Sequence, residues 1–516
     1  MDVPIEGTEA ALAQLATGRS GCIWSRFIAD TLTPVGAALR LMVPERGDFL
    51  LESVEGGEVR GRYSVLGLDP DLVFRAKGTK AEINRHWKAD RTAFTGCEGN
   101  PLAELQALHN ACRFDPPVDL PPALASLVGY LGFEAAALAE DLPQAAHDAL
   151  GLPDMLFVRP TVVLIFDQLK DMAYCIAPVW ADAEADADQV GEAASLIDTM
   201  MDKLRTSVPT FTATAPALTA TAASSVCQPA SLAPEAEPVV APEDYRRMVC
   251  RAQEHIAAGD IFQVVLAQRF TAPFDLPPSA LYRALRRVNP SPFLYFLDLP
   301  GFAIVGSSPE ILVRIRDGEV TVRPIAGTRP RGATPADDRA AEAELLADPK
   351  ERAEHLMLLD LGRNDVGRVA ERGSVQVTAS YTVERYSHVM HIVSNVTGHL
   401  AAGRGALEAV LAGFPAGTVS GAPKIRACEI IAELEQETRG PYAGAVGYFA
   451  PDGSVDSCIV LRTAVIKDGI MHVTAGAGIV AESDPDAEQR ECVAKAGALF
   501  SAASEALRLA AGRTAG

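Results

Sequence analysis

Apolar and polar residues alternate over many short runs of this chain, and the runs come in pairs joined by turns that contain glycine. LLESVEGGEVRGRYSVLG turns at Gly56-Gly57, and VFRAKGTKAEINR turns near Gly78. Asp-Gly turns join three further pairs, LVRIRDGEVTVRPI, YFAPDGSVDSCIV and LRTAVIKDGIMHVTAG. Alternation with a period of two around such a turn predicts an antiparallel hairpin. Because parallel neighbours need long crossover connections, we expect large antiparallel sheets.

Helical patterns lie in blocks between these hairpins. Residues 181–205 predict one helix, and PEDYRRMVCRAQEHIAAG predicts another that ends at Gly259. Two further helices begin with an N-cap aspartate followed by proline, at Asp348-Pro349 and at Asp484-Pro485. In the first of these, Glu351 is expected to complete a capping-box-like pair. The sequence therefore predicts an α+β fold, in which large antiparallel β-sheets form a sandwich-like core with flanking helices.

One stretch separates the chain into two regions. Residues 206–240 contain no Lys or Arg and are rich in Ala, Thr, Ser and Pro, so they cannot bury a regular apolar face. We interpret them as a linker or a disordered insertion. The 516 residues then divide into an N-terminal region, 1–205, and a second region, 241–516.

Composition restricts the partners of this protein. The formal net charge is −21 and the pI is near 4.9, so nucleic acid and anionic membranes are not expected partners. No apolar run is long enough to predict a membrane span, and the acidic start does not predict a signal peptide. The nine cysteines are scattered and include no C-x-x-C pair. That pattern favours a reducing cytoplasm over disulfides or a zinc site.

Two carboxylates are candidate metal ligands. Glu354 and Glu491 each lie in the second turn of one of the two Asp-Pro helices, and Glu354 is followed directly by the apolar run LMLLDL. A solvated helix surface is the ordinary interpretation of a single acidic helix residue. Two carboxylates from different helices that lie near a core suit Mg²⁺, which prefers oxygen ligands and retains waters.

Two glycine-rich segments invite a nucleotide-binding interpretation, which we reject. TAGAGIVAES is followed by a new N-cap and Pro485, and too little chain remains for a βαβ unit. The backbone N–H groups of Gly476, Ala477 and Gly478 could still cradle a carboxylate. GTVSGAPK has the wrong glycine spacing for a P-loop, but it could present Lys424 to an anion at the start of a helix.

Single residues add further candidates, each with an alternative. His388 and His391 lack the H-E-x-x-H zinc pattern; a packed histidine is the ordinary interpretation, and a general acid or base is the other. Glu310 could be a strand-start carboxylate or a general acid. Arg462, in the apolar strand CIVLRTAVI, could be an exposed edge residue or an anion ligand. The arginines of VRPIAGTRPRG could supply positive potential or pair with nearby acids: Arg323, Arg329 and Arg331.

Six motifs in one order resemble the chorismate-utilising enzymes, and most closely the component I group of anthranilate synthases: PIAGTRPRG, EHLMLLDLGRND, GTVSGAPK, GAVGYF, CIVLRTA and AGAGIVAESDP. The resemblance covers about residues 240–510 and is weaker in the N-terminal half. It implies a chorismate-binding catalytic domain at 241–516, a regulatory element within 1–205, and a lyase of cytoplasmic tryptophan biosynthesis that requires Mg²⁺.

The resemblance also assigns roles to individual residues. Glu354 and Glu491 resemble the Mg²⁺ ligands of the family. Glu310 resembles the acid that helps the C4 hydroxyl of chorismate leave, and His391 resembles the histidine that assists the later proton and pyruvate step. The remaining matches resemble the chorismate-binding set, to which Lys424 is added as a candidate: Gly327, Thr328, Tyr442, Arg462, Gly476, Ala477 and Gly478.

Two positions indicate the nucleophile. Relatives that add water carry a lysine at the position of Gln263, and aminodeoxychorismate synthases carry a lysine at the position of Ala326. Neither residue here can act as a base or as an attacking amine. The resemblance then implies that external ammonia attacks chorismate to give 2-amino-2-deoxyisochorismate, and that loss of pyruvate gives anthranilate. Gln263 and Thr328 are further candidate catalytic residues.

The resemblance implies two partners. No G-x-C-x-G glutaminase motif is present, so we expect a hetero-oligomer with a separate glutamine amidotransferase subunit, component II, that supplies ammonia. LLES and NPSPF resemble the tryptophan-sensing motifs of the family, which predicts feedback inhibition through a set of four residues: Ser53, Pro292, Phe293 and Leu294. The rival interpretations are an enzyme that stops at 2-amino-2-deoxyisochorismate and a catalytically silent, tryptophan-binding subunit.

Overall fold

The computed structural model describes residues 4–55, 59–145, 147–182, 188–207, 236–386 and 389–511, and two 12-stranded sheets form its centre. All pairs of strands in both sheets are antiparallel. The first sheet has the order β1 (Gly21–Ile28), β10 (Met172–Val179), β9 (Val162–Asp167), β3 (Val59–Leu68), β2 (Asp48–Glu55), β13 (Phe293–Leu299), β14 (Phe302–Ser308), β23 (Thr463–Lys467), β24 (Ile470–Ile479), β12 (Gln263–Pro273) and β11 (Glu237–Pro238), and β20 (Gly421–Ala422) also pairs with β12.

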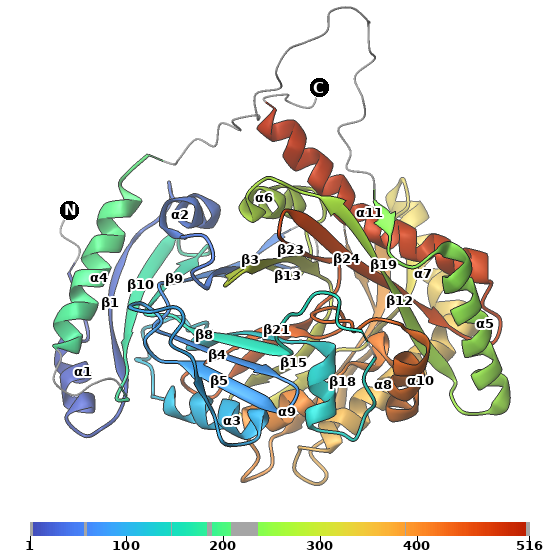
Figure 1. The fold of residues 1–516 in the computed structure, drawn as a ribbon, viewed down its shortest axis with the longest axis horizontal. Coiled ribbons are helices and arrows are strands. Elements are labelled where there is room, and N and C mark those ends of the chain that lie inside the picture. Colours follow the sequence, from blue (N-terminus) through green and yellow to red (C-terminus); the bar gives the residue numbers. More distant parts are fainter. Residues whose placement is uncertain are drawn as a thin grey trace, which may run out of the picture.

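The second sheet lies across from the first (Figure 1). Its order is β17 (Ile325–Pro330), β19 (Val389–His399), β16 (Glu319–Val322), β15 (Ile311–Arg316), β22 (Val455–Ile459), β21 (Ala445–Phe449), β7 (Leu127–Leu131), β8 (Met155–Arg159), β4 (Leu72–Lys77), β5 (Lys80–Asn84) and β6 (Thr95–Gly96), and β18 (Gln376–Arg385) also pairs with β19. One apolar cluster contains Ile304 and Val305 of the first sheet together with Val313 and Ile315 of the second. The core therefore lies between the sheets.

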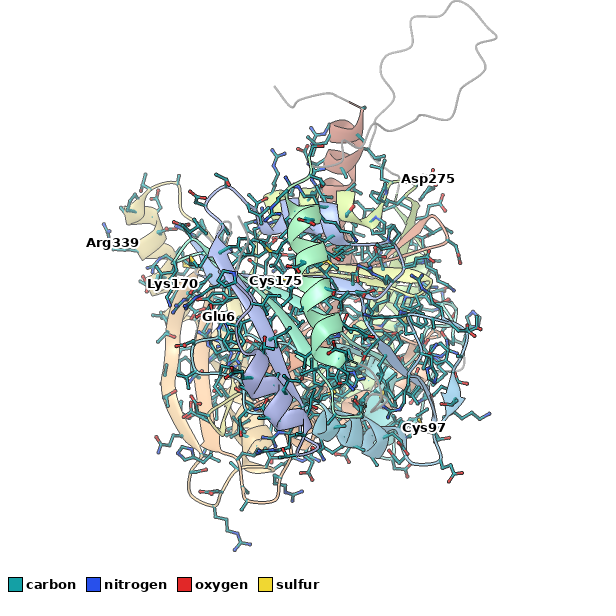
Figure 2. All side chains as sticks on the ribbon, turned by 90° about the vertical axis from the view of Figure 1, so that its left-hand side faces the viewer. Glu6, Cys97, Lys170, Cys175, Asp275 and Arg339 are labelled. Carbon is teal, nitrogen blue, oxygen red and sulfur yellow. The ribbon has the colours of Figure 1, made fainter. Side chains whose placement is uncertain are left out.

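Helices flank this sandwich (Figure 1). They are α1 (Thr8–Leu15), α2 (Pro34–Leu41), α3 (Pro101–Ala111), α4 (Gln189–Leu204), α5 (Pro242–Ala258), α6 (Pro278–Val288), α7 (Pro335–Ala347), α8 (Pro349–Gly367), α9 (Ala406–Gly413), α10 (Lys424–Leu434) and α11 (Pro485–Ala510), with 3₁₀ turns at Phe133–Leu138 and Gly417–Val419. Figure 2 views the molecule from the side of α4, which packs on β10 and helps to bury Cys175. Within the described ranges no helix is both long and apolar enough to cross a bilayer.

The predicted α+β architecture and its hairpins are confirmed. The five pairs form β2–β3, β4–β5, β15–β16, β21–β22 and β23–β24, although the turn at Gly56-Gly57 lies outside the described residues. Asp317 and Asp468 adopt φ values of 49° and 51° in their Asp-Gly turns. Short polar side chains tolerate this left-handed conformation better than most, which explains why the Asp-Gly signal predicted these turns.

Two helix predictions need correction. Ala181 and Asp182 form a turn, and α4 begins at Gln189 because the Asp188 side chain accepts the Gly191 N–H as the N-cap. Asp348 and Asp484 cap α8 and α11 as predicted. Glu351, however, completes no capping box.

Strands from both regions of the chain build both sheets. β2 pairs with β13, and β7 pairs with β21, so each sheet continues from the N-terminal region into the C-terminal one. The division into a regulatory region, 1–205, and a catalytic region, 241–516, stays a prediction. Most of the predicted linker at 206–240 lies outside the described residues, and at its end Glu237–Pro238 form β11.

Candidate functional site

A bulge between β17 and β19 brings Thr328 beside His391. The register shifts between Ala326 and Thr328, and Gly327 occupies the bulge with a φ of 74°, a conformation that favours glycine. His391 Nδ1 lies 3.2 Å from the Gly327 carbonyl oxygen and 3.0 Å from the Thr328 hydroxyl. Since a carbonyl only accepts, Nδ1 carries the proton and Nε2 is left as the basic nitrogen. Burial lowers the pKa of His391 to about 4, so the ring is neutral near pH 7.

Glu310 and Arg462 lie close to this histidine. Glu310, between β14 and β15, is 7% exposed, and burial raises the pKa of its carboxyl group to about 8, although the Thr418 hydroxyl and Arg462 act in the opposite direction. Arg462 is held at a φ of 48° just before β23. Its charge lowers the pKa of both Glu310 and His391. The site therefore combines a protonated acid, a neutral base and a cation.

The Arg462 guanidinium group is available to an external anion. Its side chain makes no hydrogen bond or ion pair with any other residue in the described part of the chain. Burial lowers its pKa, and Tyr386 and Glu310 counteract this effect. Because most arginines near a protein core are paired, an unpaired one beside a base and an acid is typical of an anion-binding site.

The glycine strand β24 presents backbone donors toward the same region. Val265 and Ala267 of β12 donate away from β24, to the Ser420 carbonyl oxygen at 2.9 Å and the Glu435 carboxylate at 2.8 Å. In an antiparallel ladder, opposite residues exchange either both hydrogen bonds or neither. Val265 lies opposite Gly478 in the ladder, and Ala267 lies opposite Gly476. The N–H groups of these two glycines therefore point away from β12.

The N–H groups of Gly476 and Gly478 are not covered by β23, because the pairing of β23 with β24 ends before it reaches them. The pairing of β23 with β24 stops at Val473, before the glycines are reached. The N–H of Ala477, which lies opposite Leu266, points to β12 instead. A Cβ at Gly476 would lie 2.8 Å from the Tyr442 hydroxyl, so glycine makes room for this buried tyrosine. Gly476, Gly478 and Tyr442 thus form one polar wall.

The two predicted metal ligands lie close together. Burial raises the pKa of Glu354, and the negative charges of Glu351 and Glu491 raise it further. The Gln263 amide lowers this pKa, and Gln263 also lies so close to Gly478 that a Cβ there would be 2.5 Å from its Nε2. Gln263 therefore lies between Glu354 and the glycine strand.

Glu491 already has a cationic neighbour. Its carboxylate lies 2.7 Å from Lys495 Nζ, and the same Nζ donates to the Gly476 carbonyl at 2.8 Å. In the described ranges no group of three or more His, Cys, Asp and Glu side chains converges on one point. Mg²⁺ is commonly held by one or two carboxylates with waters and a substrate oxygen, so the pair Glu354 and Glu491 fits the donor chemistry of that ion.

Lys424 and the arginines of VRPIAGTRPRG are occupied by protein carboxylates. Lys424 Nζ lies 2.9 Å from Asp365 in a nearly buried pair, which leaves no free cation for an anion there. Arg323 pairs with Glu384, and Arg331 pairs with Asp338 at 2.8 Å. Arg329 pairs with Asp348 at 2.7 Å and with Glu351 at 3.0 Å, which is why Glu351 does not cap α8. Of the two interpretations, pairing with neighbouring acids is correct.

Sequence reasoning missed several neighbours of the site. Tyr386 packs its ring 5.5 Å from that of His391, and Thr418 faces Glu310. Glu351 lies near both Glu354 and Gly327, since a Cβ on the glycine would be 3.2 Å from Glu351 Oε2. Glu351 lies one helical turn from Glu354, so the sequence could have identified it as a third carboxylate near the site. No sequence pattern identified Tyr386 or Thr418. His388 lies outside the described residues.

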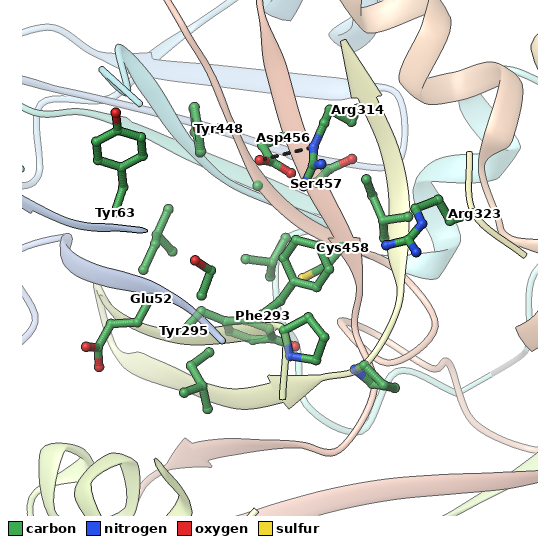
Figure 3. A pocket seen from close by; sticks show the side chains of 18 of the residues that line it. Glu52, Tyr63, Phe293, Tyr295, Arg314, Arg323, Tyr448, Asp456, Ser457 and Cys458 are labelled. Carbon is green, nitrogen blue, oxygen red and sulfur yellow. Dashed lines mark ion pairs between the residues drawn. The ribbon is translucent and has the colours of Figure 1, made fainter. Parts of the chain in front are cut away.

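The predicted regulatory residues line a cavity of about 740 Å³ between the sheets (Figure 3). Ser53 of β2 lies directly opposite Phe293 of β13 in the ladder, so the LLES and NPSPF motifs meet there. Pro292 and Leu294 complete the predicted set. Residues from β21 and β22 supply the facing wall, which the sequence did not predict: Tyr448, Asp456, Ser457 and Cys458.

Comparisons with known proteins identify the relatives of this chain. Residues 48–501 match the family model described as chorismate binding enzyme. The chain is 51% identical to anthranilate synthase component 1 of Cereibacter sphaeroides, with 95% of each chain covered. It is 44% identical to the protein of that name from Thermus thermophilus, with 92% of this chain and 96% of the relative covered.

Two solved structures have folds similar to that of this chain. Anthranilate synthase component I of Streptococcus pneumoniae superposes with a TM-score of 0.73 at 34% identity, over 92% of this chain and 98% of that one. The menaquinone-specific isochorismate synthase of Escherichia coli has a TM-score of 0.67 at 20% identity, over 96% of this chain and 99% of that one, which shows the shared fold. The resemblance drawn from the six motifs is confirmed.

Proposed function

Because the chain belongs to the family of chorismate-binding enzymes, we propose that it acts as component I of an anthranilate synthase, converting chorismate and ammonia to anthranilate and pyruvate. The observation that carries the proposal is the convergence of Glu310, His391 and unpaired Arg462 in one site of a chain this similar to its relatives. It is tested by following fluorescent anthranilate formed from chorismate, ammonium and Mg²⁺.

The substrate is a dicarboxylate, and the site offers donors of the matching kind. We assign one carboxylate to Arg462, the Tyr442 hydroxyl and the open N–H groups of Gly476 and Gly478. A charge-assisted bond to arginine is stronger than a neutral one, so Arg462 is expected to contribute most to binding. Lys424 is left out of the proposed set because Asp365 pairs with it.

Proton transfers follow from the protonation states of the site. Glu310 is largely protonated at pH 7 and donates its proton to the C4 hydroxyl as that group leaves. His391 is neutral, and its Nε2 accepts the ring proton in the step that releases pyruvate and restores aromaticity. The Gly327 carbonyl and Thr328 hydroxyl hold the imidazole in this orientation through Nδ1.

The attacking nitrogen comes from outside the chain. Gln263 cannot act as a base, and Ala326 carries no amine, so free ammonia adds at C2 of chorismate. We assign Gln263 the role of holding the Glu354 carboxylate. The relatives are named component 1, which supports a hetero-oligomer with an ammonia-supplying amidotransferase subunit. The cytoplasmic location stays a prediction from the cysteine pattern.

Glu354 and Glu491 are proposed to hold Mg²⁺. A bound Mg²⁺ supplies positive charge for the ring carboxylate of the substrate. Glu491→Ala should abolish Mg²⁺-dependent turnover and the Mg²⁺-induced shift in melting temperature, because one of two protein ligands is lost. Glu482→Ala, which removes an exposed carboxylate nearby, is the matched control. If Glu491→Ala kept the Mg²⁺-dependent turnover of the unaltered chain, this assignment would be disproved.

Tryptophan is proposed to bind in the cavity beside Ser53 and Phe293. Its volume of about 740 Å³ accommodates an indole ring, and the Arg314–Asp456 pair on its wall offers charges for an amino acid head group. The cavity reaches Tyr386, whose ring contacts His391. Occupancy can thus be coupled to the catalytic site, and the coupling must be reciprocal. Rates unchanged by saturating tryptophan would exclude this regulation.

A further inference from the structure

Arg439 is buried among the loops that surround the proposed chorismate site, three residues before Tyr442. It is 5% exposed, and all three guanidinium nitrogens donate hydrogen bonds. Nε donates to the Glu435 carboxylate at 2.8 Å, and Nη2 donates to the same carboxylate at 2.5 Å. Nη1 donates to the Val419 carbonyl at 2.8 Å, and Nη2 also donates to the Val265 carbonyl at 2.7 Å.

These partners belong to separate elements of the site. Val419 lies in the GTVSGAPK segment, next to Thr418, which faces Glu310. Val265 lies opposite Gly478 in the ladder of β12 and β24. Glu435 ends α10 and accepts the N–H of Ala267, which lies opposite Gly476. One guanidinium group therefore connects the Glu310 side of the site to the glycine strand.

The N-terminal region holds the backbone of Arg439 in place. Glu134 is 8% exposed, and it lies in the 3₁₀ turn Phe133–Leu138. Its Oε1 accepts the Arg439 N–H at 2.7 Å, and its Oε2 accepts the Gly440 N–H at 3.0 Å. Phe133 donates its N–H to the Gly440 carbonyl at 2.8 Å. Three hydrogen bonds thus join this turn to the RGPY sequence.

The same guanidinium group lies beside two aromatic rings. Its central carbon is 4.6 Å from the centroid of Phe133 and 5.7 Å from that of Tyr442. Both distances are within the range of cation–π attraction. The Tyr442 ring is buried, and its hydroxyl lies beside Gly476. A shift of Arg439 would therefore displace the tyrosine hydroxyl relative to the glycine donors.

We propose that Glu134 and Arg439 are positioning residues for chorismate: through the RGPY backbone and the Tyr442 ring they fix the distance between the Tyr442 hydroxyl and the glycine strand. The proposal rests on the proposed function, since Tyr442 must contact the substrate. It gives the N-terminal region a part in substrate affinity that is separate from the cavity beside Ser53. Glu134 is 305 residues from Arg439 in the chain.

Glu134 should make this affinity depend on pH. Burial raises its pKa to about 7, so the carboxylate gains a proton as the pH falls through that value. The protonated form has one fewer good acceptor for the two N–H groups, and the KM for chorismate should rise below pH 7. The titratable and charged groups around it come from both regions: Tyr130, Asp154, Cys428, Glu435, Glu437 and Arg439.

Glu134→Gln tests the proposal in the full chain. The amide keeps one acceptor oxygen and loses the other, so one of the two N–H groups is left unpaired. We expect the KM and the dissociation constant of chorismate to rise about fivefold with kcat nearly unchanged, the size of one lost hydrogen bond. The rise in KM below pH 7 should disappear. Glu140→Gln, which alters a half-buried carboxylate paired with Arg368, is the matched control.

A double variant separates positioning from general destabilisation. If Glu134 acts through Tyr442, then Glu134→Gln combined with Tyr442→Phe should bind chorismate no more weakly than Tyr442→Phe alone. Binding is measured by calorimetry without ammonium, so the test holds even if the chain forms no anthranilate, an outcome that would refute only the proposed function. Should Glu134→Gln fail to fold, Phe133→Leu removes the ring under the guanidinium and should raise the KM about threefold.

Three results would overturn the proposal. The first is an unchanged dissociation constant for chorismate in folded Glu134→Gln. The second is an equal effect in Glu140→Gln, which would indicate a general charge effect. The third is full additivity with Tyr442→Phe, which would mean that Glu134 supports the fold and not the position of the tyrosine.

Discussion

The burial of Glu310 sets the fraction of its carboxyl group that is protonated at pH 7, and this fraction can be calculated. An ordinary glutamate has a pKa near 4.5, at which about 0.3% of the groups carry a proton at pH 7. With the pKa raised to about 8, about 90% are protonated, so burial increases the population of the acid roughly 300-fold. Glu310→Gln keeps the volume and removes the transferable proton. We expect kcat to fall by a factor of about 10² to 10⁴, the usual contribution of a general acid.

The pH profile of the reaction distinguishes an acid from a residue that only packs. In the unaltered chain kcat/KM should fall about tenfold per pH unit above about pH 8, because the acid of the free chain is lost as the pH rises through its pKa. The assay follows anthranilate fluorescence at chorismate concentrations well below KM, with the concentration of unprotonated ammonia held constant. Glu310→Gln should lose this decline, and Glu319→Gln, on the exposed start of β16, should retain it. A decline that persists in Glu310→Gln would refute the reasoning.

Three other substitutions test neighbouring parts of the site. His391→Gln should slow pyruvate release more than amination, so 2-amino-2-deoxyisochorismate should accumulate in a chromatographic assay; equal slowing of both steps would contradict the role of Nε2. Gly327→Ala should lower the unfolding free energy by about 1–2 kcal/mol and also reduce kcat/KM, because its Cβ would meet Glu351 Oε2 at 3.2 Å. Gly301→Ala, at a φ of 82° with open space around it, should lower stability alone, and loss of activity in both would contradict the argument. Ser53→Phe should fill the cavity and raise the tryptophan concentration needed for half inhibition, with unchanged activity in its absence; retained sensitivity would place the effector elsewhere.

The hairpins and helix starts were predictable because their signals are local. Asp317 and Asp468 precede glycine in the turns that the sequence predicted, and Asp348 and Asp484 cap α8 and α11. Alternation specifies which face of a strand is buried and carries no information about its partner. The pairing of β2 with β13 joins residues more than two hundred positions apart, so no local pattern could predict it.

Charged residues were the least predictable part of the site. Lys424 was expected to bind an anion and instead pairs with Asp365, because a lysine at a helix start can satisfy its charge within the protein. Glu351 was expected to cap its helix and instead pairs with Arg329. Arg439 carried no signal at all, since its burial depends on Glu134 and Glu435 meeting it in the folded chain. Glu354 and Glu491 could be selected from the sequence because their helices both begin with Asp-Pro and because an apolar run follows Glu354; their role as metal ligands stays a prediction.

The formation of anthranilate itself tests the central claim most directly. The purified chain is incubated with chorismate, Mg²⁺ and ammonium, and anthranilate fluorescence and pyruvate are measured together. We predict that both products appear in equal amounts as chorismate is consumed. Accumulation of 2-amino-2-deoxyisochorismate without anthranilate would contradict the claim and support an enzyme that stops at that compound, and no consumption of chorismate would support a catalytically silent subunit.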